Sequence, residues 1–429
     1  MNRLWPKESI WDNPGPDRRG YPVLDLMEFG ADPTGTRANF DEVMTRAIAR
    51  AQEMSTPHVT INMPSGYLRT SAPVVITNVS TLRTIHIRGQ GSFATRILNQ
   101  NLSGDIFQLG MHAAPTSTDY TRGLMFSGFT FGPTGAVSGQ PAGFRLHGTS
   151  GVQFHDCYSH SNGFGWALGL EGLIDNDCIY TSMVNCGGKP GPQDTDQPMI
   201  YLGCGGTLSI TGNLSRWDGG NSSNDFIRHE HTSSNWDGLY ISDQIFESWL
   251  HYVISRGLGI SNFEFTGGQV DRADIFFFAE PNPGVAGRNN NWNIHDTQIL
   301  GNVAGSEVGG YGVYYSSGNS GLARNLRFSN NNVQRLGAQA VWTADNATDA
   351  MIVGNKFTSC GHGYGTPTSV LKIGGGATII GNRGYYDPSD SDLNAYQNGI
   401  DWDNGPIADR SSTGNDWHGR LGAAEVGTM

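Results

Sequence analysis

Hydrophobic and polar residues follow one recurring pattern along most of the chain. In residues 239–271, Leu239 and Ile241 alternate with polar residues, a polar turn follows at Asp243 and Gln244, and Phe246 comes next. The same order starts again at residue 263, with a Gly-Gly turn. A period of two places the apolar side chains on one face of a strand, so each copy predicts a strand, a tight turn and a second short strand.

The pattern recurs at intervals of 24 to 34 residues, which indicates a solenoid, propeller or array. Unequal intervals fit a solenoid with loops inserted on one side. Gly and Asn recur at the turns, where they tolerate a left-handed backbone best. We therefore predict an all-β fold, a right-handed parallel β-helix, with one internal stack of apolar side chains. The predicted stack is Ile210, Ile241, Phe265, Ile294, Phe328 and Ile352.

The N-terminal part predicts a cap for such a solenoid. A helix is expected over residues 41–54, after Asn39 as N-cap, and strands are expected over 21–27, 59–63 and 85–87. The motifs FGADPTGT, INMPSGYLRTSAPVVI and IHIRGQG around this Ala-rich helix resemble the N-terminal signature of the pectate-lyase-like superfamily. The resemblance covers residues 22–98, and the repeats extend it to about residue 390.

The resemblance implies a β-helix whose helix plugs the open end, where apolar side chains and strand edges would otherwise meet water. It implies little about activity, because the superfamily includes lyases, hydrolases, fructan-processing enzymes, epimerases and phage tailspikes. We divide the chain into an arm (1–20), a cap with the first coils (21–98), a β-helix body (99–390) and a polar tail (391–429).

Composition and charge limit the kinds of partner and the cellular location that we expect. The net charge of −12 argues against nucleic-acid binding, and an acidic surface does not steer an anionic polymer unless Arg residues cluster locally. No apolar run is long enough to span a membrane, and the first twenty residues lack the apolar core of a signal peptide. An extracellular or virion-associated location is expected, with a cytoplasmic one left open. The five cysteines are odd in number and form no CxxC, so buried free thiols are expected, without zinc or disulfides.

Two acidic residues hold the same place in consecutive copies. Glu247 and Asp271 each follow the last apolar residue of the pattern, and Arg216 is expected one coil earlier in the same outward column. Strands about 4.8 Å apart would bring the carboxyl groups to roughly 5 Å, the retaining-glycosidase distance. At that distance one pKa should rise and the other fall. The alternative, given equal weight, is a solvated strand face with Arg216 as a salt-bridge partner.

Residues 208–300 contain the other candidates. Asp243 is a reserve catalytic residue, although Asp is also a normal turn former. The insert 221–238 could fold over the same cleft, but its HEH triplet alternates between strand faces and predicts no metal site. Exposed tryptophans could stack on sugar rings, whereas we expect at least one of Trp217, Trp236 and Trp249 to pack under a loop instead. The candidate substrate-binding residues are Arg216, Trp217, Asp218, Trp236, Trp249, His251 and Arg272.

Three functions remain open. We expect a glycoside-hydrolase-type enzyme that cleaves a polysaccharide by hydrolysis or glycosyl transfer, without a cofactor or metal. A polysaccharide lyase would usually need a basic residue and often Ca²⁺, and the expected outward column lacks acidic residues on three successive coils. A non-catalytic glycan-binding tail fibre is the third possibility. Analogy with tailspike-like proteins and the aromatic content also suggests a homotrimer.

Overall fold

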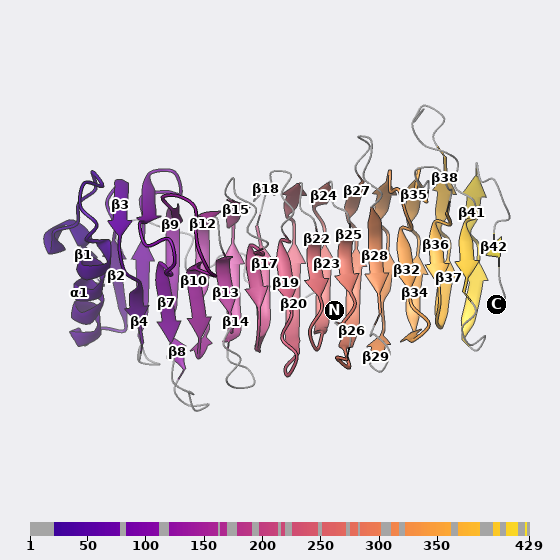
Figure 1. Cartoon of the computed structure of the whole chain (residues 1–429), viewed down its shortest axis with the longest axis horizontal. Helices are drawn as coiled ribbons and strands as arrows, with labels where there is room; N and C mark the ends of the chain where they lie inside the picture. Colours follow the sequence, from indigo (N-terminus) through magenta and orange to yellow (C-terminus); the bar gives the residue numbers. More distant parts are fainter. Residues whose placement is uncertain are drawn as a thin grey trace.

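The protein is a solenoid of strands stacked along one long axis (Figure 1). The structure is a computed structural model. It describes residues 21–77, 83–110, 120–161, 164–169, 178–190, 197–212, 216–218, 225–247, 251–271, 275–281, 284–301, 310–316, 322–361, 368–386, 398–403, 409–418 and 425–426. The described strands form one 29-stranded and one 13-stranded sheet, and their neighbours pair in parallel.

The 29-stranded sheet contains two ladders, joined in β9 (Leu124–Pro133) and β12 (Gln153–Ser161), which belong to both. We call the first the long-strand ladder. Its other strands are β1 (Val23–Asp25), β2 (His58–Asn62), β5 (Thr84–Arg88), β14 (Cys178–Val184), β17 (Gly205–Thr211), β20 (Trp236–Ser242), β23 (Ile260–Thr266), β26 (Arg288–His295), β30 (Arg327–Ser329), β34 (Ala350–Val353), β37 (Ala377–Ile380) and β40 (Arg410–Thr413). Short strands at its edge are β8 (Thr121–Arg122), β11 (Thr149–Ser150), β29 (Leu322–Arg324) and β33 (Ala347–Thr348).

The second is the short-strand ladder, which follows a tight turn in the regular coils. Its other strands are β3 (Gly66–Thr70), β6 (Thr95–Asn99), β15 (Gly187–Pro190), β18 (Arg216–Asp218), β21 (Ile245–Glu247), β24 (Gln269–Asp271), β27 (Gln298–Leu300), β31 (Asn332–Gln334), β35 (Lys356–Thr358), β38 (Arg383–Tyr385) and β41 (Asp416–His418). In the regular coils the chain then enters the 13-stranded sheet, as it does from β21 to β22.

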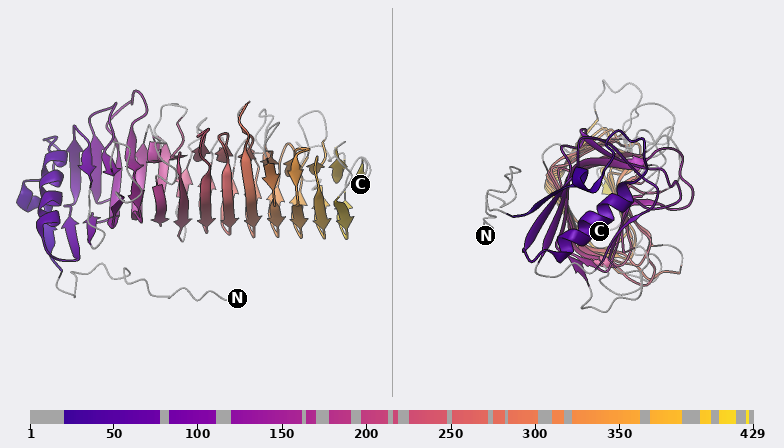
Figure 2. Two further views of the ribbon diagram at one scale, coloured as in Figure 1. Left: turned by 90° about the horizontal axis from the view of Figure 1, so that it is seen from below. Right: turned by 90° about the vertical axis from the view of Figure 1, so that its left-hand side faces the viewer.

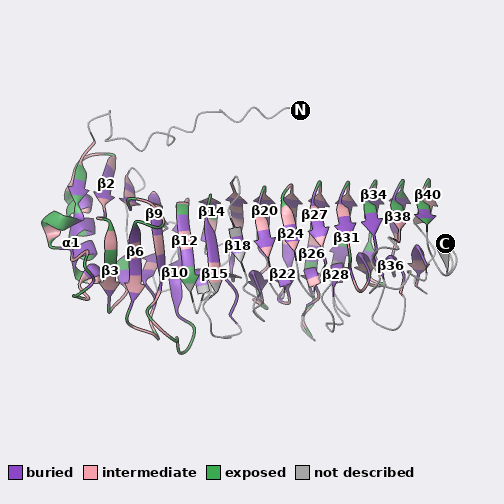
Figure 3. Cartoon of the chain, turned by 90° about the horizontal axis from the view of Figure 1, so that it is seen from above, coloured by how far each residue is buried: buried purple, intermediate pink, exposed green. Residues whose placement is uncertain are grey.

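The 13-stranded sheet closes the coils on the remaining side. Its strands are β4 (Val74–Ile76), β7 (Phe107–Gly110), β10 (Ala142–His147), β13 (Phe164–Leu168), β16 (Ile200–Leu202), β19 (Ile227–His229), β22 (His251–Ser255), β25 (Ile275–Ala279), β28 (Tyr311–Tyr315), β32 (Val341–Thr343), β36 (Leu371–Ile373), β39 (Ile400–Trp402) and β42 (Glu425–Val426). Buried residues run through the interior of the solenoid from end to end (Figure 3).

The expected internal stack is confirmed. Successive strands of the long-strand ladder pair these side chains in unbroken register, and each is at most 2% exposed. The stack is Ile210, Ile241, Phe265, Ile294, Phe328 and Ile352. Alternation of apolar and polar residues therefore fixes which face of each strand is buried.

The turn between the two ladders explains the recurrent Gly-Asn pair. The first turn residue has a positive φ, +54° at Asp243, +56° at Asn330 and +67° at Gly354. In three successive later coils the second turn residue is a buried asparagine, Asn331, Asn355 and Asn382, and each amide bonds to the next: Asn331 Nδ2 donates to Asn355 Oδ1 at 3.1 Å and Asn355 Nδ2 to Asn382 Oδ1 at 2.9 Å. These amides satisfy backbone groups that a tight turn would leave buried without partners.

The helix α1 (Phe40–Glu53) closes the N-terminal end of the solenoid (Figure 2). It follows the 3-10 helix η1 (Leu26–Phe29) and packs on β2, β3 and β4. Its buried face is Phe40, Val43, Met44, Ala47, Ile48 and Ala51. Asn39 precedes the helix, but its amide donates to the carbonyl of Gly30 at 3.0 Å instead of capping the helix. The first expected strand is shorter than 21–27, because η1 begins at Leu26.

The expected polar tail from residue 391 is wrong for the described residues 398–403 and 409–418. There β39, β40 and β41 continue all three stacks of strands, and Asn415 extends the amide ladder by accepting from the Asn382 amide at 3.0 Å. These last coils are hard to recognise in the sequence because most of their outward residues are polar. The expected arm, residues 1–20, lies outside the described residues.

Two expectations from composition can be compared with the fold. All five cysteines are buried and free, as expected. None of the helices within the described ranges has the length and apolarity needed to cross a membrane.

Candidate functional site

Glu247 and Asp271 lie side by side on the short-strand ladder. They end β21 and β24, and the ladder pairs them directly. Their inward neighbours Phe246 and Val270 are at most 1% exposed, whereas both acids are half-buried on the outer face. The expected register is therefore confirmed, because the turns before both strands have the same length.

The expected place of Arg216 is wrong. Trp217, and not Ser215, is the buried residue of β18, so Arg216 pairs with Ile245 and Asp218 pairs with Glu247. The connection from β17 to β18 spans more residues than the two-residue turns of later coils, which shifts the register. Asp218, Glu247 and Asp271 thus occupy three successive rungs, which we call the acidic column. The sequence-based argument that no three successive coils provide an acid no longer holds.

The end of β24 is tied to the 13-stranded sheet. The Asp271 amide donates to the Tyr252 hydroxyl at 3.1 Å, and that hydroxyl donates to the Asp271 carbonyl. Tyr252 is 1% exposed and belongs to β22. A buried aromatic ring with both hydrogen bonds made to one residue gives the Asp271 backbone a fixed position.

Asp243 lies in the turn and outside the acidic column. It has a left-handed backbone, with φ +54°, and its side chain lies over Gly267, where an added Cβ would come 2.6 Å from Asp243 Oδ1. Asp243 is therefore the first residue of the tight turn, as Gly267 is in the next coil.

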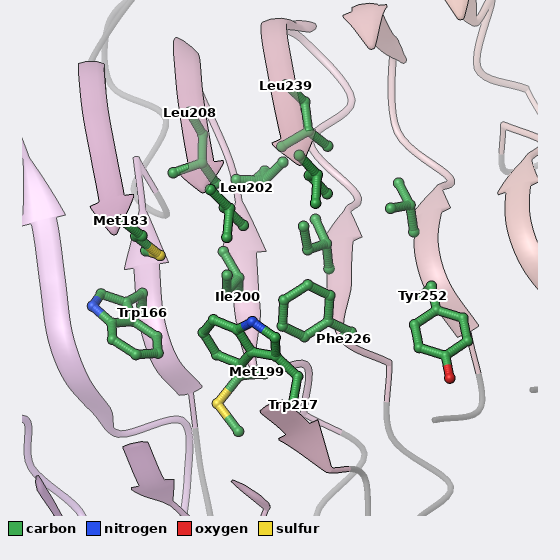
Figure 4. Close-up of a cluster of buried hydrophobic side chains, with 14 of the residues drawn as sticks. Trp166, Met183, Met199, Ile200, Leu202, Leu208, Trp217, Phe226, Leu239 and Tyr252 are labelled. Atoms are coloured by element: carbon green, nitrogen blue, oxygen red, sulfur yellow. The ribbon is translucent and has the colours of Figure 1, made fainter. Parts of the chain in front are cut away.

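Two expected sugar-stacking residues are instead part of the core. Trp217 and Trp236 are both 0% exposed. Figure 4 shows Trp217 inside the solenoid near Trp166 and Phe226, with ring centroids 5.8 and 4.7 Å away. Its indole Nε1 donates to the Gln244 side chain at 3.1 Å. A fully buried ring cannot stack on a sugar, so this expectation is wrong for both residues. Trp249 and Arg272 lie outside the described residues.

His251 belongs to a buried charged network at the start of β22. Its Nδ1 lies 2.6 Å from Asp225 Oδ1, and Arg228 Nε lies 2.5 Å from Asp225 Oδ2. Burial alone would raise the pKa of Asp225, but the hydrogen bonds and charges of His251 and Arg228 outweigh it and lower that pKa. His251 is 8% exposed, so its main partner is Asp225 and it does not present its ring to solvent as a substrate contact would.

Sequence reasoning missed an aromatic band on the outer face of the 13-stranded sheet. Phe278, Tyr314 and Trp342 occupy successive rungs and are half-buried. Phe278 and Tyr314 stack at 5.2 Å, Tyr314 meets Trp342 edge-on at 4.8 Å, and Lys372 Nζ lies 4.6 Å from the Trp342 ring centre. The sequence signal is an aromatic residue at the same outward position of three successive strands. It was missed because the recurring sequence pattern marks only the strands of the two ladders, and these three strands belong to the 13-stranded sheet.

Comparison with known proteins shows which solved structures have the same fold. No family model and no curated protein matches the chain. Among solved structures, the A-module of the mannuronan C-5 epimerase AlgE4 from Azotobacter vinelandii superposes with a TM-score of 0.55 at 12% identity, covering 94% of this chain and 98% of that one. The two share the fold of a right-handed parallel β-helix.

Two further members of this fold resemble the chain to the same degree. A tailspike protein of E. coli bacteriophage HK620, solved with a pentasaccharide, has a TM-score of 0.54 at 11% identity, covering 92% of this chain and 70% of that one. The family 28 exopolygalacturonase of Yersinia enterocolitica has a TM-score of 0.53 at 10% identity, covering 94% and 77%. Such identities establish the parallel β-helix fold and no activity.

Proposed function

We propose that the protein is an enzyme that cleaves a polysaccharide by hydrolysis or glycosyl transfer, with Glu247 as the acid/base and Asp271 as the nucleophile or base. The observation that carries the proposal is their direct pairing on adjacent rungs of an outer face. A strand spacing of about 4.8 Å supports a carboxyl separation close to the roughly 5 Å of retaining enzymes.

In this mechanism the two carboxyl groups have separate tasks. The protonated Glu247 gives its proton to the glycosidic oxygen, while the ionised Asp271 attacks the anomeric carbon. Glu247, now ionised, then takes a proton from water or an acceptor hydroxyl while that oxygen attacks the anomeric carbon, so the bond from the sugar to Asp271 breaks and the carboxylate is restored. The two hydrogen bonds between the Tyr252 hydroxyl and the Asp271 backbone, one donated by each, hold the nucleophile in place.

Two further observations support a glycan substrate. The half-buried band of Phe278, Tyr314 and Trp342 offers ring faces of the kind that stack on sugars. The solved proteins of the same fold that resemble the chain include a mannuronan C-5 epimerase, an exopolygalacturonase and a tailspike in complex with a pentasaccharide. An extracellular or virion-associated location follows from the same proposal.

The acidic column also supports a second candidate, a polysaccharide lyase. Backbone register gives Asp218, Glu247 and Asp271 successive rungs, and carboxylates are the ligands that Ca²⁺ prefers. The ion would neutralise a substrate carboxylate and so ease removal of the neighbouring proton.

Product analysis distinguishes the two candidates. The full chain is incubated with a panel of polysaccharides, and products are measured by mass and by near-ultraviolet absorbance, with and without EDTA. We expect products that have gained water or an acceptor sugar, and activity that survives EDTA. A product that absorbs in the near ultraviolet, formed only when Ca²⁺ is present, would establish the lyase. If no glycan in the panel is cleaved while some are bound, the non-catalytic fibre protein becomes the better description.

A further inference from the structure

A second candidate site lies on the same ladder, a few coils before the acids. A cavity of about 320 Å³ opens over β6, β9, β12 and β15. Its lining includes Phe93, Arg96, Tyr158, His160 and Lys189. None of these residues is a candidate from the sequence, and none takes part in the proposed chemistry.

The cavity is positively charged in a strongly acidic protein. Among the described residues that line it, three are basic and none is Asp or Glu, although the chain has a net charge of −12. Burial lowers the pKa of His160, and the positive charges of Lys189 and Arg96 lower it further. The lowered pKa favours the neutral ring of His160, so Arg96 and Lys189 give the cavity its positive charge and His160 adds a ring nitrogen that can hydrogen-bond.

Aromatic rings form another side of the same cavity. Phe93 is 75% exposed, the largest exposure among the large apolar side chains of the described residues. Its ring centre lies 6.1 Å from that of Tyr158, at an interplanar angle of 42°. An exposed Phe beside a half-buried Tyr is unfavourable in water, and together they present apolar faces that suit the C–H face of a sugar ring.

Strand register connects the cavity to the acidic column. His160 pairs with Lys189, and the pairing of Gly188 with Trp217 places Lys189 one rung before Asp218. Asp218 in turn pairs with Glu247. At about 4.8 Å a rung, the basic cavity begins roughly 10 Å from the proposed acid/base along one continuous face.

We propose that this cavity binds an acidic sugar residue of the polymer that is cleaved at Glu247 and Asp271, and so selects an anionic polysaccharide. The inference rests on the proposed function for the position of cleavage, but not for binding. The anionic group lies among Arg96, His160 and Lys189, where a guanidinium offers a forked donor for a carboxylate or a sulfate. The sugar ring lies against Phe93 and Tyr158.

Equilibrium binding tests the proposal in the full chain carrying Asp271→Asn, so that ligands persist. The probes are oligosaccharides bearing uronate, sulfate or phosphate groups, each paired with the same oligosaccharide after removal of the charge. We expect charged probes to bind roughly tenfold or more tightly than their neutral counterparts, because hydrogen bonds to charged groups contribute about 1.5–3 kcal/mol. The class that binds tightest identifies the anionic group.

Variants locate the binding. Lys189→Met and Arg96→Met should each weaken binding of the charged probe roughly tenfold and reduce its dependence on salt. Lys356→Met is the matched control, because Lys356 lies on the outer face of the same ladder beyond the acids, and it should leave binding unchanged. Phe93→Ser should weaken charged and neutral probes alike.

Each outcome decides the proposal. Equal binding of every charged probe and its neutral counterpart overturns it, as does binding that Lys189→Met and Arg96→Met leave intact. Failure of the proposed chemistry would look different: charged oligosaccharides would bind at this cavity, yet the unsubstituted chain would not cleave them.

Discussion

Glu247 and Asp271 can be changed without disturbing the core, since both are half-buried on an outer face and only their neighbours Phe246 and Val270 are internal. We predict that Glu247→Gln and Asp271→Asn each lower turnover by orders of magnitude, because each removes a separate role in the reaction. The melting temperature should stay the same or rise, because like charges on adjacent rungs repel.

Rate and melting temperature measured together test this prediction. Glu264→Gln is the control, since Glu264 is a partly exposed acid on the long-strand ladder and should keep normal turnover. If Glu247→Gln and Asp271→Asn retain turnover, the acidic column is only a solvated strand face.

A buried histidine makes stability depend on pH. His229 ends β19 and is 0% exposed, and burial, with His231 adding to it, lowers its pKa to about 3. The unfolded chain takes up this proton near its ordinary pKa of about 6.5, well before the folded protein does. Stability from the neutral ring is therefore complete above that pH and is lost as pH falls toward about 3.

We predict that His229→Leu flattens this part of the pH dependence. The difference should reach a few kcal/mol across the window, since one pKa unit corresponds to about 1.4 kcal/mol. Denaturant unfolding at several pH values measures it, with His418→Leu, at an exposed side chain, as the control. Parallel curves for the unsubstituted chain and His229→Leu would contradict the prediction. His86, whose pKa burial also lowers to about 3, should add acid sensitivity that His229→Leu does not remove.

How far the site could be predicted at this scale depends on turn length. The pairing of Glu247 with Asp271 followed from two turns of equal length, which preserve the register. Arg216 was misplaced because the preceding connection is longer, and alternation alone cannot count the added residues. The burial of Trp217 and Trp236 was missed because a large aromatic residue between polar ones fits either face of a strand, and only the register decides.

At the scale of elements, α1 acts as the lid of the solenoid. Ala47 is buried on the face of α1 that covers the N-terminal end of the solenoid, while Ala49 lies on the exposed face of the helix. Ala47→Asp places a charge in the core, and we predict a loss of several kcal/mol, because an unpaired buried charge is among the costliest single changes. Ala49→Asp, the same chemical change on the opposite face, should cost within about 0.5 kcal/mol.

Hydrogen exchange can locate that loss. In a solenoid each coil contacts mainly its neighbours, so Ala47→Asp should reduce protection in β1 to β5 and leave β30 to β38 protected. Uniform loss along the chain would show that the coils unfold as one unit. The helix itself was predictable from its apolar spacing, but the Asn39 bond to Gly30 was not, since it depends on where η1 turns the chain.

At the scale of the whole molecule, the sequence predicted the architecture because one stack of apolar residues repeats through it. The prediction was wrong for β39, β40 and β41, which were interpreted as a tail because most residues on their outer faces are polar. The aromatic band of Phe278, Tyr314 and Trp342 was missed for a related reason, since strands of the 13-stranded sheet lack the turn that marks the repeat.

The outer face of the long-strand ladder carries exposed apolar side chains. It exposes Tyr240, Met351 and Ile380 by 37–39% each, although they belong to strands of a regular sheet. A hollow of about 300 Å³ lies beside Met351, and the other side chains around it are polar or charged, among them Asn293, Asn325 and Arg327. Exposed apolar side chains next to a hollow on a flat face suit contact with the same face of another copy.

We therefore predict a homotrimer in which long-strand faces meet around one axis and the short-strand faces, with the acidic column, stay open to a polymer. Sedimentation equilibrium should give three times the chain mass of 46.3 kDa. Met351→Glu should dissociate the trimer, because it places three like charges near the axis. Val75→Glu, at an exposed apolar residue on the 13-stranded sheet, should not. A mass of one chain for the unsubstituted protein, or equal effects of both variants, would exclude this arrangement.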